Sequence, residues 1–302
     1  MFAVVHRFDQ TPNPGWGCDL DPTGSGDEGV ICKWNQPATA EITQIGLRAD
    51  FNSKGSTLEL SIIPTAQAGS DQGAKIGDLL LASITFFSGA GLPKVPGGWF
   101  QVPNGSVVSN SNDQTVVWYH FMASGDSSSY TWTWNSVAFP AGGITVWRGV
   151  NSSNPFDVPA AVASGTGKTA LAPALTLVSA NTRLLSVFGA GNQNSQVFPQ
   201  PGGGPGIGAD ETIALKVIGG PAIETYYAQE VGDRIQITES GKSTTPQSVE
   251  ISEAGTPLGN TATWDAISIA HRPERRPSAC RTRAINKNPD VMHCLMCADN
   301  QA

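Results

Sequence analysis

Short apolar runs separated by turn-forming residues recur along the whole chain. The clearest alternation is at Tyr130, Trp132 and Trp134, which are separated by two threonines. Side chains of a strand alternate between the two faces of a sheet, so this period of two predicts a strand and excludes a helix. Similar short apolar or alternating runs occupy residues 41–51, 56–66, 77–87, 114–123 and 141–150. The sequence lacks long apolar stripes at helical spacing, which argues against an alternation of helices and strands.

A second set of runs follows residue 170 and is similar to the first. In both sets a buried strand leads into a Gly-rich loop, an aromatic strand ends in Gly-Asp, and an apolar strand ends in an arginine, Arg148 or Arg272. The runs of the second set lie at residues 174–180, 183–191, 211–218, 224–231, 234–240 and 262–273. We predict a weak internal repeat of two half-units that share the core of one sandwich, with two small separate domains as the alternative.

The sequence therefore predicts an all-β protein with a jelly-roll-like β-sandwich between irregular ends. Residues 1–65 are predicted to be an N-terminal attachment segment with a few strands, residues 66–273 the sandwich domain, and residues 274–302 a basic C-terminal tail. Within the domain, the predicted parts are half-units at about 74–160 and 170–273 and a linker at 161–169. The loops expected to point outward are 88–98, 104–114 and 193–210.

Composition agrees with many short strands joined by turns. Only 14% of the 302 residues are charged, against about 25% in typical soluble proteins, and the chain has 34 glycines and 21 prolines. The formal net charge of −7 does not give the electrostatic footprint of a nucleic-acid-binding protein. No run of about 18 apolar residues is present, so we predict no membrane span.

The chain start and the cysteines indicate where the protein is made. His6, Arg7 and Asp9 stand where a signal peptide would have its apolar region, so we predict synthesis in a cytosol without such a signal. An odd number of cysteines in this setting argues against a disulfide framework. The five cysteines are Cys18, Cys32, Cys280, Cys294 and Cys297.

The order of the runs over residues 74–273 resembles a β-sandwich module of bacteriophage and prophage structural proteins, which also recurs in some bacterial surface or secreted proteins. The stretches that carry the resemblance are Gly77-Asp78-Leu79-Leu80, Gly98-Trp99, Gly125-Asp126, and Arg148-Gly149-Val150 with Asn154-Pro155. Each is weak alone, and their order makes the pattern specific.

The resemblance implies a non-enzymatic virion protein, such as a fibre, a capsid decoration protein or a tail appendage. It implies other virion proteins as partners, a homo-oligomer with a trimer as the first expectation, and attachment to a host surface polysaccharide as a further role. It supplies no catalytic residues and no cofactor. Location in the virion after synthesis in the host cytoplasm follows from the same resemblance.

Residues 164–171, "SGTGKTAL", contain the Gly-Lys-Thr ending of a phosphate-binding loop. That motif needs a glycine five residues before Gly167, where this chain has Val162, and it needs a helix afterwards. Pro173 and the following apolar run instead predict a strand. We therefore predict a turn between the half-units, with Lys168 exposed and no nucleotide bound.

The hypothesis of a serine hydrolase also lacks the helix that such a site requires after its serine. Ser127 follows Gly125-Asp126, and Asp290 and His293 are three residues apart, as in hydrolases with a Gly-Asp-Ser motif. In those enzymes a helix follows the serine, whereas here the alternating strand 129–136 follows it. Gly-Asp also recurs at other turns, so we predict no catalytic residues.

Two groups of residues could suggest a metal, but neither has a known spacing. Adjacent His-Cys ligands fit a tetrahedral zinc site poorly, although zinc binding by the tail stays open as an alternative; the residues concerned are Cys280, His293, Cys294 and Cys297. The acidic residues near the start lack the frame of a calcium loop; they are Asp19, Asp21, Asp27 and Glu28. We predict no bound metal.

The aromatic residues give the only candidate binding site. Trp99, Trp118, Trp132 and Trp134 would form a sugar-stacking surface if their rings were exposed, although most aromatics of a charge-poor sandwich fill its core. The alternative function is therefore a carbohydrate-binding adhesion module of a bacterial surface or secreted protein. His120, between apolar residues, is predicted to be a packed residue rather than a base.

Overall fold

The structure is a computed structural model of the chain, and it describes a large central part in full. Backbone and side chains are described for residues 55–62, 73–109, 113–138, 140–167, 169–179, 182–189 and 263–274, and further strands are described by their backbone alone. Within these residues the fold is all-β and sandwich-like, as the alternating pattern predicts, with one short 3-10 helix, η1 (Ser88–Ala90), and no α-helix.

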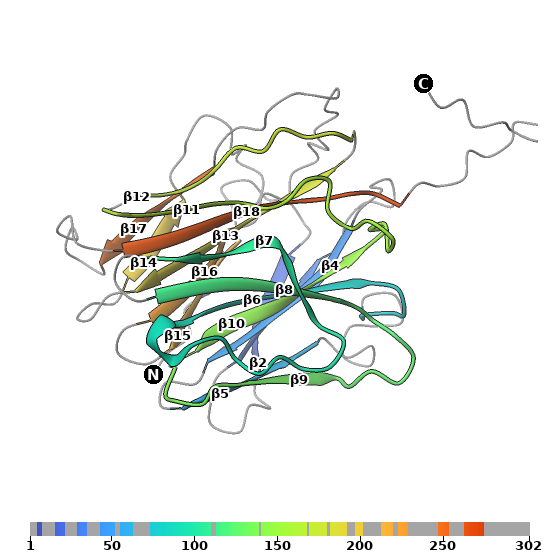
Figure 1. Cartoon of the computed structure of the whole chain (residues 1–302), viewed down its shortest axis with the longest axis horizontal. Helices are drawn as coiled ribbons and strands as arrows, with labels where there is room; N and C mark the ends of the chain where they lie inside the picture. The colour runs from blue at the N-terminus through green and yellow to red at the C-terminus, as the bar shows by residue number, and fades with distance from the viewer. Residues whose placement is uncertain are drawn as a thin grey trace, which may run out of the picture.

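Two large antiparallel sheets carry most of the strands (Figure 1). The seven-stranded sheet has the order β2 (Trp16–Asp21), β3 (Gly29–Trp34), β4 (Thr43–Phe51), β10 (Ala141–Arg148), β6 (Leu79–Phe87), β8 (Asp113–Phe121) and β7 (Phe100–Val108). The six-stranded sheet has the order β1 (Val5–Arg7), β15 (Ile213–Gly219), β16 (Ile223–Ala228), β13 (Arg183–Gly191), β18 (Thr263–His271) and β11 (Ala161–Thr166).

Two smaller sheets complete the arrangement. A two-stranded ribbon pairs β5 (Thr57–Ser61) with β9 (Ser129–Thr133). A three-stranded sheet has the order β12 (Thr169–Ala172), β17 (Gln247–Glu253) and β14 (Val197–Pro201). In Figure 1 the ribbon lies below the seven-stranded sheet and the six-stranded sheet lies above it.

The seven-stranded sheet is buried on both faces at its centre. Along β6, Leu80 and Ile84 belong to a core shared with the β5–β9 ribbon, whereas Leu79 and Leu81 belong to a core shared with the six-stranded sheet. Successive side chains of a strand point to opposite faces, so β6 must be apolar at both parities. This is why residues 79–87 form a continuous apolar run rather than an alternating one.

The strands that the internal repeat aligns have the same order in the two large sheets. The first half-unit contributes the neighbours β10, β6 and β8, and the aligned strands of the second are the neighbours β18, β13 and β16. Two related units packed face to face produce such an arrangement. Strands from residues 1–65 also join this body, because β1 pairs with β15 and β4 pairs with β10.

Two segments expected to be loops are largely strands. Residues 161–166 of the predicted linker form β11, which pairs with β18 along its whole length, so a tertiary partner outweighs a composition typical of turns. Residues 104–108 and 113–114 of the predicted loop 104–114 belong to β7 and β8. Lys168 and most of 193–210 lie outside the described residues.

An irregular edge strand closes one side of the sandwich. Pairing of β7 with β8 shifts between Gln101 and Ser106, and Asn104 in this bulge has a φ of 59°. The Asn104 amide donates a 2.6 Å hydrogen bond to the Ala160 carbonyl, and the Ala160 N–H donates a 2.9 Å bond to the Pro103 carbonyl. The bulge therefore directs the edge of one sheet onto the segment that enters β11 of the other.

The double burial of β6 predicts the result of two adjacent truncations. Leu80→Ala and Leu81→Ala should each lower the free energy of unfolding by about 2–5 kcal/mol, because each removes a fully buried side chain from a different core. Leu171→Ala, at a side chain 46% exposed, should change it by less than about 0.5 kcal/mol. Urea unfolding measures all three, and a near-neutral result at either Leu80 or Leu81 would contradict burial of both faces.

Candidate functional site

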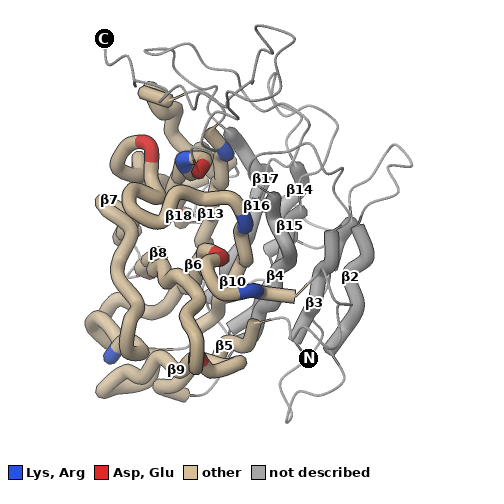
Figure 2. The backbone as a smooth tube through the Cα atoms, turned by 90° about the vertical axis from the view of Figure 1, so that its right-hand side faces the viewer, with Lys and Arg blue, Asp and Glu red and all other residues tan. Residues whose placement is uncertain are grey.

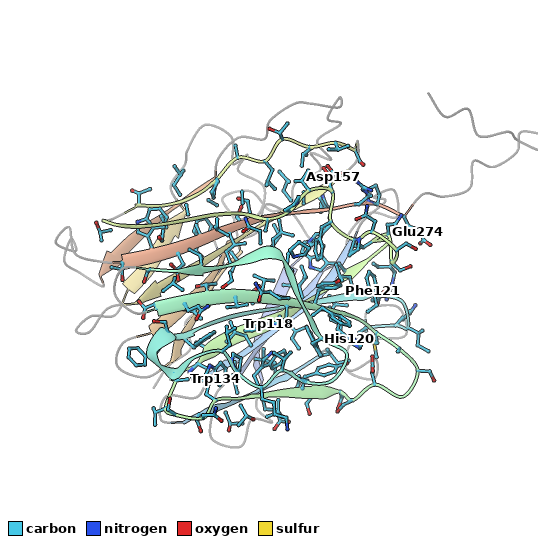
Figure 3. All side chains as sticks on the ribbon, in the orientation of Figure 1. Trp118, His120, Phe121, Trp134, Asp157 and Glu274 are labelled. Carbon is cyan, nitrogen blue, oxygen red and sulfur yellow. The ribbon has the colours of Figure 1, made fainter. Side chains whose placement is uncertain are left out.

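The four predicted sugar-stacking tryptophans lie in the core between the seven-stranded sheet and the β5–β9 ribbon. The exposed fractions of Trp99, Trp118, Trp132 and Trp134 are 6%, 3%, 0% and 3%. Figure 3 shows Trp118 and Trp134 on the ribbon side of β8. The interpretation of these residues as a sugar-binding surface does not fit this burial, because the rings fill the space between the ribbon and the sheet.

These aromatic rings pack against one another instead. The Trp99 ring meets the Trp132 ring edge-on with centroids 5.1 Å apart and the Tyr130 ring edge-on at 5.0 Å. The Phe86 and Trp134 rings are 5.1 Å apart. Aromatic pairs in this geometry contribute about 0.5–1.5 kcal/mol beyond their burial, so the cluster holds the ribbon onto the sheet.

Gly77-Asp78 and Gly125-Asp126, the Gly-Asp sequences within the described residues, form turns of the same construction at one end of the seven-stranded sheet. Gly77 and Gly125 both have φ near +90°, a conformation that glycine adopts without strain. In each turn the aspartate carboxylate accepts a hydrogen bond from the backbone N–H three residues earlier, at 2.8 Å for Asp78 and 2.6 Å for Asp126. The turns lie side by side, because the Gly77 N–H donates to the Met122 carbonyl at 2.8 Å.

Each of these aspartates then binds a cationic or histidine side chain of a neighbouring strand. Arg148, at the end of β10, donates to the Asp78 carboxylate at 2.8 and 2.9 Å. His120, near the end of β8, contacts the Asp126 carboxylate at 2.6 Å. Burial opposes charge on Asp126, but the Ala123 N–H and His120 outweigh it and lower the pKa of this carboxyl. His120 is thus mostly buried, as expected, and it is also part of a polar cluster that the sequence did not indicate.

A third pair of this type joins the end of the first half-unit to the second. The Asp157 carboxylate accepts hydrogen bonds from the Val178 N–H at 2.6 Å and the Ser179 N–H at 3.0 Å, and it lies 3.3 Å from the Arg272 guanidinium. Burial opposes its charge, yet Ser179, the Val178 N–H and Arg272 together lower the pKa of Asp157. The arginine that ends each half-unit therefore binds a carboxylate.

The most unusual polar cluster lies between the two large sheets and joins β8 to β18. The Thr115 hydroxyl donates a 3.1 Å hydrogen bond to the Asp265 carboxylate, and the Thr263 hydroxyl donates a 3.4 Å bond to the Asp113 carboxylate. Asp113 and Thr115 are two residues apart on one sheet, and Thr263 and Asp265 are two apart on the other. We call this reciprocal arrangement the inter-sheet clasp.

Both clasp carboxyls favour the neutral form. Burial raises the pKa of Asp113 to about 7, against the hydrogen bond from Thr263. Burial also raises the pKa of Asp265 to about 8, and the negative charge of Asp113 adds to this effect. One oxygen of Asp265, Oδ1, has no hydrogen-bond partner among the described residues, which is consistent with a protonated acid.

Paired carboxyls with raised pKa values are also a feature of catalytic sites, but the clasp is closed to solvent. The exposed fraction is 5% for Asp113 and 0% for Asp265. Thr85 extends the cluster with a 2.9 Å hydroxyl–hydroxyl contact to Thr115. Access for a substrate is needed for chemistry, so burial favours a structural role.

Other predicted chemistry falls on exposed or undescribed residues. Ser127 is exposed in the turn before β9, where its hydroxyl accepts a 3.2 Å hydrogen bond from the Ser129 N–H. Asp290 and His293 lie outside the described residues, so their distance from Ser127 stays unmeasured. Asp19 and Asp21 lie on β2, which is described by its backbone alone, and the other candidate ligands lie outside the described residues; these are Cys280, His293, Cys294, Cys297, Asp27 and Glu28. Where side chains are described, no three His, Cys, Asp or Glu residues gather as a metal site.

Comparison with known proteins does not identify a family. Neither protein-family models, nor curated proteins, nor solved structures give a match to this chain. In the described part of the chain no helix is long and apolar enough to cross a membrane.

The close packing at the clasp predicts that one methyl group added at Gly189 lowers the stability of the fold. A Cβ at Gly189 on β13 would lie 2.6 Å from the Thr85 hydroxyl oxygen and closer still to that of Thr115. Gly189→Ala should therefore lower the free energy of unfolding by about 1–3 kcal/mol through overpacking. Gly97→Ala is the matched control, because no atom lies within 4 Å of its added Cβ. Equal stability of the two variants in urea unfolding would rule out tight packing at the clasp.

The clasp also predicts an unusual pH dependence of stability. An acid whose pKa is higher in the folded state binds its proton more tightly there, so its contribution to stability is fully present at low pH and is lost as the pH rises. The loss should run from about pH 4, where unfolded aspartates ionise, through the folded values of about 7 and 8.

Asp265→Asn should flatten this pH dependence and make the protein more stable than the wild type at about pH 8.5, because the amide stays neutral. Glu59→Gln, which removes an exposed carboxylate, should keep the wild-type slope. Melting temperatures measured from about pH 5 to 9 test both variants. A wild-type stability that rises over this range would show that the clasp is ionised in the folded protein.

Proposed function

We propose that this chain is a non-enzymatic structural protein of a bacteriophage particle, of the fibre, decoration or tail-appendage type. The proposal rests on the resemblance of residues 74–273 to phage structural modules and on the use of the polar groups. Each of three carboxylate pairs fastens one segment of backbone to another: Asp78 with Arg148, Asp126 with His120, and Asp157 with Arg272.

That use of charge is the observation that carries the proposal. Charged residues are sparse along the described backbone (Figure 2). Several of the charged residues that are present form ion pairs at turns and at the ends of strands. Carboxylates held in this way stabilise a rigid body, which is the property required of a subunit in a mechanical assembly.

Self-association is part of the proposal. A particle protein of this type is expected to act as a repeated subunit, and we propose a trimer with other virion proteins as partners. We also propose that the assembled protein attaches the particle to a host surface polysaccharide. A carbohydrate-binding adhesion module is not favoured by the tryptophans, because all four are buried.

The proposal predicts that the protein copurifies with particles. Mass spectrometry of gradient-purified particles from a strain that carries the gene should find the chain as a stoichiometric component, and sedimentation of the isolated full chain should give three times the monomer mass. Lys168→Ala should enter particles like the wild type, because the motif around it lacks the glycine that nucleotide binding needs. Absence of the chain from purified particles would refute the virion role.

A further inference from the structure

His120 bridges two turns through both of its ring nitrogens. Nδ1 lies 2.9 Å from the Gly98 carbonyl oxygen, in the segment that precedes β7. Nε2 lies 2.6 Å from an Asp126 carboxylate oxygen, in the turn that precedes β9. His120 is the point at which these two turns are fastened to β8.

Both partners of the ring can only accept hydrogen bonds. A carbonyl oxygen has no proton to donate, and neither does an ionised carboxylate, whereas a neutral imidazole has one N–H donor and one acceptor nitrogen. Two bonds to two acceptors therefore require a proton on each nitrogen. Both distances, 2.9 and 2.6 Å, are hydrogen-bond distances, and an imidazolium ion can donate both bonds at once.

The surroundings suit a positive ring. The Trp99 ring lies over the imidazole with centroids 5.5 Å apart and planes inclined by 31°, and the Tyr130 ring meets it edge-on at 5.9 Å. An aromatic face close to a cation is attractive, and tryptophan gives the strongest effect. The close approach also explains Gly98, where an added Cβ would lie 3.1 Å from the imidazole.

The charged groups around the ring are few. The turn contributes the Asp126 carboxylate, and β9 contributes the Tyr130 phenol, whose pKa burial and the neighbouring Asp126 raise to about 12. Asp78 directly precedes the neighbouring strand β6, and Arg148 ends β10; these two residues bind each other. The segment 95–99 brings no titratable side chain.

We propose that His120 is a proton-dependent latch that holds the segment Val95–Trp99 closed over the aromatic core. When the ring loses a proton to water, only one N–H remains. The carboxylate is the stronger acceptor and keeps it, so the Nδ1 lone pair then faces the Gly98 carbonyl and that bond is lost. The segment stays tethered at Lys94, whose N–H donates a 2.7 Å bond to the Thr133 carbonyl.

Loss of the hydrogen bond between His120 and Gly98 would first affect Trp99, the next residue in the chain. Its N–H donates a 3.3 Å bond to the Pro96 carbonyl within the same turn, and its ring is 6% exposed. Opening of the turn exposes both the amide and the indole. The device would let a change from acid to alkaline conditions alter this end of the sandwich without unfolding it.

The test uses NMR of the full chain with labelled histidine. At about pH 5 both ring nitrogens of His120 should be protonated, while His271 should stay neutral as an internal control, because burial and the charge of Arg183 lower its pKa to about 3. At about pH 8.5, amide hydrogen exchange of Trp99 should accelerate roughly tenfold or more relative to that of Lys94, beyond the intrinsic pH effect. Lys94 reports the changes in stability that both amides share.

Variants separate the latch from other effects. His120→Gln should abolish the pH dependence of the Trp99-to-Lys94 exchange ratio, and Ser128→Ala, at an exposed side chain of the adjacent turn, should retain it. A single neutral tautomer of His120 in the folded wild type at about pH 5 would overturn the proposal, even if His120→Gln did not fold. A ratio that does not change with pH in the wild type would overturn it equally.

Discussion

Burial of both faces of the seven-stranded sheet is the constraint on which the rest of the structure depends. A sheet in the middle of a stack needs apolar side chains at both parities, and β6 supplies them with Leu79, Leu80, Leu81 and Ile84. Because this sheet is covered by the ribbon below and the six-stranded sheet above, the tryptophans become packing residues. The buried polar side chains therefore lie at the ends of the strands and in one layer between the two large sheets.

That polar layer shows how two sheets with apolar faces hold a fixed position relative to each other. Apolar contacts tolerate sliding, whereas the clasp hydrogen bonds form in one register only. Neutral carboxyls make this compatible with burial, since an ionised acid between sheets would carry a large desolvation cost. Thr115 and Thr263 each donate a hydrogen bond to one oxygen of an acid, and Thr85 in turn contacts the Thr115 hydroxyl.

Much of this fold was predictable from period-two patterns, but the polar clusters were not. The alternation at Tyr130, Trp132 and Trp134 identified β9, and the apolar run at residues 77–87 indicated the buried strand β6, although not its burial on both faces. The clasp joins residues 150 positions apart, so no local pattern could reveal it, and its Asp113 fell in a segment expected to be a loop. Turn-like composition likewise concealed β11, whose strand conformation depends on pairing with β18.

The two large sheets have the same strand order, and one ring contact between them joins positions that the predicted repeat aligns. Trp147 and His271 each precede the arginine that ends a half-unit, and their rings are in contact, with centroids 4.8 Å apart. Contact between aligned positions of two related units is what a two-fold axis between them produces, as at the centre of an isologous dimer interface. If the two half-units are related as the sequence predicts, this ring pair is the place where their equivalent strand ends meet. The clasp instead joins β8 to β18, which the predicted repeat does not align with each other, so it makes the contact between the two halves specific.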